Sequence, residues 1–83
     1  MDDAHALALI DMRIKRLVEG NPGYSRFLGK VAEMKIDYGP GYRVYYTNTG
    51  KENVILLCGG DKSTQQGDIE TARKLAVQYS QGE

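Results

Sequence analysis

The sequence predicts a small α+β domain in which an N-terminal and a C-terminal helix pack against an antiparallel meander of three strands. Three observations predict this class. The chain opens with apolar residues at helical spacing, two alternating runs flank Gly39-Pro40-Gly41, and helical spacing returns after residue 63. With 83 residues, we expect the whole chain, 1–83, to form a single domain.

The first helix is expected over residues 3–19. Asp2 or Asp3 can cap its start, and Gly20 followed by Pro22 is a usual stop signal. The apolar positions that would face the core share the 3,4,3 spacing of one helical face: Leu7, Ile10, Ile14 and Leu17. Residues 21–30, which contain Gly23 and Gly29, are expected to form a loop.

The stretch Glu33–Tyr46, "EMKIDYGPGYRVYY", predicts a β-hairpin. Its first run alternates apolar and charged residues, and glycine and proline are the residues that a tight turn needs. In the second run Tyr42, Val44 and Tyr46 share the inward parity. The opposite parity carries the residues that we expect on an open face: Lys35, Arg43 and Tyr45.

The last strand is expected over residues 53–59, "NVILLCG". This run is apolar on both parities, which favours a strand that is central or covered on both faces. The spacing of Ser63 and Gln66 is that of a capping box, so a helix should begin near Thr64.

Composition excludes several kinds of site. Eleven basic and eleven acidic residues cancel, so the overall charge does not favour a nucleic-acid partner. The chain has a single cysteine, Cys58, so it cannot form an internal disulfide. One cysteine and one histidine, His5, are too few ligands for a Cys/His zinc site, and we expect neither a metal nor a cofactor. The chain has no long apolar run and begins with acidic residues, so we expect a cytoplasmic protein that does not insert into membranes.

Lys62 is the position that points most clearly to chemistry. It lies between the end of the last predicted strand and the start of the last helix, where backbone N–H groups attract anions. The flanking "GGDKST" is not a phosphate-binding P-loop, because Asp61 stands where that motif needs glycine. A solvated loop lysine remains the alternative for Lys62.

Arg43 and Tyr45 also have two interpretations. On an open face, Arg43 and Lys35 could bind phosphates and Tyr45 could stack on a base. Alternatively, Arg43 forms an ion pair with Glu33 or Asp37 across the strands.

The motifs "EMKIDYGPGYRVYY" and "LLCGGDKSTQQGDI", together with "ALIDMRIKRLVEGNPG", resemble the RelE/HigB-type toxins of bacterial toxin–antitoxin modules. The most similar branch of that RelE/ParE superfamily is the phage-derived "addiction module killer" group. The resemblance covers about residues 6–79. It implies a small antiparallel sheet with helices on one face.

The resemblance further implies an mRNA interferase, a metal-independent endoribonuclease that cleaves mRNA on the ribosome and is inhibited by a cognate antitoxin. In such a reaction the 2′-oxygen attacks the adjacent phosphate. By position, Arg43 and Lys62 correspond to the cations that stabilise this phosphate, and Lys35 corresponds to a lysine with an acid–base role. Together with Tyr45 they would contact RNA.

This chain departs from the pattern in two places. Asp68 stands near the position where such toxins often carry tyrosine or histidine, which leaves the proton-transfer residues open. Relatives usually begin with a strand and a helix before the first helix seen here. We therefore expect a shortened fold that could form a homodimer to cover exposed surface. A gyrase-directed toxin of the ParE kind and a non-enzymatic interaction module are the alternatives.

Overall fold

The computed structural model describes residues 4–49 and 53–81 of the chain. Within them the strands form one antiparallel sheet in the order β1-β2-β3-β4, with a helix before it and a helix after it. The elements are α1 (Ala4–Val18), β1 (Ser25–Leu28), β2 (Val31–Ile36), β3 (Tyr42–Thr49), β4 (Asn53–Gly60), the 3₁₀ turn η1 (Lys62–Thr64) and α2 (Gln65–Gln81). The predicted α+β class is confirmed.

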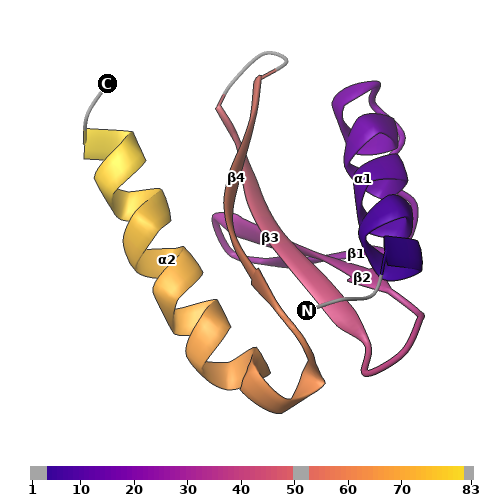
Figure 1. Cartoon of the computed structure of the whole chain (residues 1–83). Helices are drawn as coiled ribbons and strands as arrows, with labels where there is room; N and C mark the ends of the chain where they lie inside the picture. The colour runs from indigo at the N-terminus through magenta and orange to yellow at the C-terminus, as the bar shows by residue number, and fades with distance from the viewer. Residues whose placement is uncertain (1–3, 50–52, 82–83) are drawn as a thin grey trace.

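The two helices lie on opposite faces of the sheet, with α1 on one side and α2 on the other (Figure 1). The resemblance implied helices on one face, and this expectation is wrong. The reason is that β2 and β3 bury side chains on both faces, so each face needs its own helix. The domain therefore has three layers.

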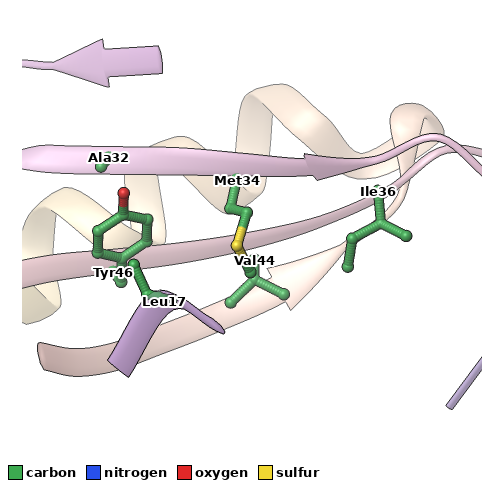
Figure 2. Packing of buried hydrophobic residues seen from close by; sticks show 6 residues of the cluster. All are labelled: Leu17, Ala32, Met34, Ile36, Val44 and Tyr46. Atoms are coloured by element: carbon green, nitrogen blue, oxygen red, sulfur yellow. The ribbon is translucent and has the colours of Figure 1, made fainter. Parts of the chain in front are cut away.

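The α1 face holds the larger apolar cluster (Figure 2). Leu17 of α1 packs there, and half-buried Ile10 and Ile14 add to the contact, as the helical spacing predicts. Leu7 instead is 54% exposed. The members of the cluster that come from the sheet alternate along β2 and β3: Ala32, Met34, Ile36, Val44 and Tyr46.

The α2 face holds a second cluster. Ile69, Ala72 and Ala76 lie on one stripe of α2 and pack on Val31 and Tyr45 of the sheet. Small alanines let the helix approach the sheet closely. This second layer covers the face that the sequence suggested would be open.

Residues 21–30 are not all loop, since β1 runs from Ser25 to Leu28 and pairs antiparallel with β2. Sequence patterning missed this edge strand because it is only four residues long and has no buried residue. Phe27 is 71% exposed. The sheet thus has four strands in the described residues, where three were predicted.

β4 is an edge strand, which corrects the expectation of a central strand. Its apolar residues on both parities have another cause. The register shifts between Tyr45 and Tyr46, which pair with Cys58 and Leu56, so Leu57 is the extra residue of a bulge. Leu57 and Cys58 both pack towards α2, whereas Leu56 is 45% exposed.

The ends of the helices agree with the sequence in part. Gly20, with φ of +92°, ends α1, and its N–H donates to the Leu17 carbonyl at 3.0 Å. The cap before α2 is Asp61 rather than Ser63, because the Asp61 carboxylate accepts from the Ser63 N–H and Thr64 completes the capping box of η1. The proposed caps Asp2 and Asp3 lie outside the described residues.

Candidate functional site

The β2–β3 turn and the connection from β4 to α2 lie at the same end of the sheet. They bring together the three cations that the sequence predicted for the site: Lys35, Arg43 and Lys62. In the register of the sheet, Lys35 pairs with Arg43, and Arg43 pairs with Gly60 at the end of β4. A Cβ on Gly41, in the β2–β3 turn, would lie 3.5 Å from Arg43 Nη1 and 3.9 Å from Lys62 Cβ. This turn therefore adjoins the corner between β4 and α2.

Arg43 is buried, with 8% of its side chain exposed. Its Nη1 donates to the Gly41 carbonyl at 2.9 Å, and its Nε lies 3.7 Å from Glu33 Oε2. Of the two ion pairs proposed for Arg43, the structure contains the one with Glu33. The distance is too long for a hydrogen bond, so the buried Nε has no hydrogen-bond partner in the described residues.

Lys62 is exposed and is the first residue of η1. Its ammonium group makes no ion pair within residues 4–49 and 53–81. The two acidic side chains nearest to it in the sequence, Asp61 and Asp68, accept hydrogen bonds from other residues. Hydrogen bonds from Ser63 hold the pKa of Asp61 below its ordinary value, and Asp68 accepts from the Thr64 hydroxyl at 2.6 Å. The positive charge of Lys62 therefore faces solvent.

Tyr45 is fully buried, so the prediction that it stacks on a base from an open face is wrong. The reason is the second layer, because α2 covers the face of β3 on which Tyr45 lies. Its hydroxyl donates to Glu33 Oε2 at 3.0 Å. Burial raises the pKa of Tyr45 strongly, and its hydrogen bond to the carboxylate raises it further, so the phenol stays protonated. Tyr46, also buried, is structural, as expected.

Glu33 is the central residue of a buried polar network that the sequence did not single out. Its carboxylate accepts from Tyr45, from Gln65 Nε2 at 2.8 Å and from Arg26 Nε at 3.1 Å. Burial by itself would raise the pKa of Glu33, but these hydrogen bonds and the charge of Arg26 outweigh it, and the pKa is lowered. Finding this network from sequence would have required β1, since Arg26 reaches Glu33 only through that strand pairing.

Three further observations concern the only histidine of the sequence, metal binding and membrane insertion. His5 is exposed and lies against Tyr38, with ring centroids 5.0 Å apart. Among the described residues, His, Cys, Asp and Glu side chains do not gather in groups of three that could hold a metal ion. None of the helices in residues 4–49 and 53–81 has the length and apolar character that a bilayer crossing requires.

Fold and site together define a small three-layer α+β domain with lysine and arginine gathered at one end of its sheet. Residues 3–77 match the family described as "Phage derived protein Gp49-like (DUF891)", and the chain belongs to this family. It is 49% identical over 77 residues to an uncharacterized protein of Haemophilus influenzae, an alignment that covers 92% of this chain and 78% of the relative. The search of solved structures gave no significant match.

Proposed function

We propose that the protein is the toxin of a toxin–antitoxin module and cleaves mRNA on the ribosome without a metal ion. Membership of a phage-derived family supports the general proposal. The RelE/HigB resemblance of the hairpin and of the "GGDKST" corner supports the specific one. Such an activity would place the protein in the cytoplasm, with the ribosome, mRNA and an antitoxin as partners.

The observation that carries the proposal is the approach of Lys62 and Arg43 across the Gly41 turn. Lys62 supplies an exposed cation for direct phosphate contact, and Arg43 supplies a buried positive charge behind it. The Glu33 carboxylate, 3.7 Å from Arg43 Nε, offsets part of this buried charge, so Lys62 is the group that contributes most to phosphate binding. Lys35 lies beside Arg43 in the register of the sheet and is half-buried.

The chemistry that fits these residues is transesterification. The 2′-oxygen forms a bond to the adjacent phosphorus and loses its proton, while the bond from phosphorus to the 5′-oxygen breaks and that oxygen gains a proton. The products are a 2′,3′-cyclic phosphate and a 5′-hydroxyl. Lys62 and Arg43 stabilise the extra negative charge on the pentavalent phosphate, and Lys35 serves in proton transfer.

Induced expression in bacteria tests the toxin assignment. The wild-type chain should arrest growth, and Lys62→Ala should relieve the arrest because the exposed cation is lost. Lys62→Arg keeps the charge and should retain toxicity. Lys74→Ala is the matched control, since Lys74 is also an exposed lysine but lies further along α2.

The result also separates the competing functions. Growth arrest with a DNA-damage response and intact mRNA would select a gyrase-directed toxin. No growth arrest by any variant would select the interaction module.

A further inference from the structure

A cavity of about 300 Å³ opens beside Lys35. It lies towards the β1 edge of the sheet, whereas Lys62 follows β4 at the other edge. Four residues line it: Arg13, Tyr24, Lys35 and Asp37. Tyr24 is 69% exposed. The cavity thus combines an aromatic ring with two cations and one carboxylate, which gives a net charge of +1 from two positive groups less one negative group.

The backbone that carries Tyr24 is held in place by two donors. Arg13 of α1 donates to the carbonyls of Lys35 at 2.9 Å, Pro22 at 3.2 Å and Tyr24 at 3.4 Å. The Lys35 N–H also donates to the Tyr24 carbonyl, at 3.3 Å. The ring therefore stands on a fixed segment, although it precedes β1.

Gly23 is part of this construction. Its φ of +68° lies in the left-handed region, which glycine adopts without strain. A Cβ there would come within 3.1 Å of Arg13 Nη2. The residue before Tyr24 must therefore be small for the Arg13 guanidinium to reach the three carbonyls.

The cavity is aligned with the proposed catalytic site. Tyr24 lies next to Lys35 across the β1–β2 ladder, Lys35 pairs with Arg43, and Arg43 pairs with Gly60. Neighbouring strands lie about 4.8 Å apart, so three spacings place the two ends of this row roughly 14 Å from each other. A strand of nucleic acid that crosses the end of the sheet would pass Tyr24 and half-buried Lys35, while Arg43 lies buried beneath it.

We propose that Tyr24 is the stacking platform for a base of single-stranded RNA, next to Lys35 of the proposed catalytic site. The inference rests on the proposed function, because it describes how the substrate of that site is held. Stacking needs an exposed ring face with a cation nearby, which Tyr24 offers and the buried Tyr45 does not.

Titration of a fluorescein-labelled single-stranded RNA oligonucleotide with the purified full chain, at fixed low salt, tests this. Tyr24→Ala should weaken binding about 5- to 150-fold, the range expected for loss of one stacked base. Tyr24→Phe keeps the ring and should bind like the wild type. Phe27→Ala is the matched control, because Phe27 is equally exposed but does not line the cavity.

Four results would overturn the inference. These are unchanged binding by Tyr24→Ala, equal weakening by Tyr24→Phe, equal weakening by Phe27→Ala, and no RNA binding by the wild type. Urea denaturation of each variant checks whether the fold is intact.

A cleavage assay on ribosomes separates the two proposals. Normal binding by Tyr24→Ala together with cleavage that depends on Lys62 would refute the platform and leave the nuclease. Binding that depends on Tyr24 in a chain that cleaves no mRNA would refute the nuclease and leave the platform.

Discussion

The hydroxyl of Tyr45 donates to the carboxylate of Glu33 at 3.0 Å inside the protein, between neighbouring strands and beneath α2. The same carboxylate also holds Arg26 of β1 and Gln65 of α2. This network joins the edge of the sheet to the start of the last helix, and Arg43 lies next to it. Glu33, Tyr45 and Arg43 on this face of the sheet are therefore part of the core, whereas Lys62 at its end is exposed.

Tyr45→Phe is expected to destabilise the fold. The substitution removes one hydrogen bond to a buried carboxylate, and such bonds contribute about 1.5–3 kcal/mol. Tyr46→Phe is the control, since its hydroxyl donates only to the neutral Ser25 Oγ at 3.2 Å and should cost about 0.5–1.5 kcal/mol. Urea denaturation measures both. A Tyr45→Phe protein with unchanged stability but lost RNA binding would contradict the structural role.

Glu33 should make stability depend on acid. Its pKa is lower in the folded protein than its ordinary value of 4.5, so the stabilisation is complete above that pH and is lost as pH falls through the folded pKa. Glu33→Gln should lose about 2–4 kcal/mol at pH 7, because a buried charged network is broken.

The variant should also show a shallower loss of stability than the wild type below about pH 4.5. The free energy of unfolding measured from pH 7 to pH 3 checks this. Parallel curves for the two proteins would show that Glu33 does not carry the acid dependence.

Gly60 should not tolerate a side chain. A Cβ there would overlap Asp68 Oδ2 and lie 2.7 Å from Thr64 Oγ1, the two atoms whose hydrogen bond closes the corner after β4. Gly60→Ala should cost about 1–3 kcal/mol, as overpacked sites do. Gly67→Ala is the control, since its Cβ would meet no atom within 4 Å and alanine favours a helix by about 0.5–1 kcal/mol. Thermal unfolding of the two variants should shift in opposite directions.

Arg13→Ala should destabilise the protein by about 1–3 kcal/mol, because three backbone carbonyls lose a charged donor. Arg16, on the same helix, is exposed, and Arg16→Ala should stay within about 0.5 kcal/mol of the wild type. Chemical denaturation compares them. Equal stabilities would mean that Arg13 does not anchor the segment before β1.

The sequence predicted the parts of the fold that depend on local pattern. The spacing of Ile10, Ile14 and Leu17 gave the buried side of α1, and alternation around Gly39-Pro40-Gly41 gave the hairpin. It could not predict that α2 crosses the opposite face, because alternation shows that one side of a strand is polar and not whether another layer covers it. Because the α2 layer was not predicted, Tyr45 was expected on an exposed face.

Of the candidate sites, too, the sequence identified only those that depend on local pattern. Lys62 could be recognised because a strand end and a helix start adjoin it in sequence. The Glu33 network and the Tyr24 cavity could not, since both depend on β1, a four-residue edge strand without a buried residue.

Cleavage of mRNA on purified ribosomes by the purified chain tests the central claim most directly. The wild type should cut ribosome-bound mRNA and leave 2′,3′-cyclic phosphate ends, and Lys74→Ala should do the same. Lys62→Ala should be slower by about 100- to 1000-fold, the usual loss when one group that stabilises transition-state charge is removed. Intact mRNA after incubation with the folded wild-type chain, or equal rates for Lys62→Ala and Lys74→Ala, would contradict the account.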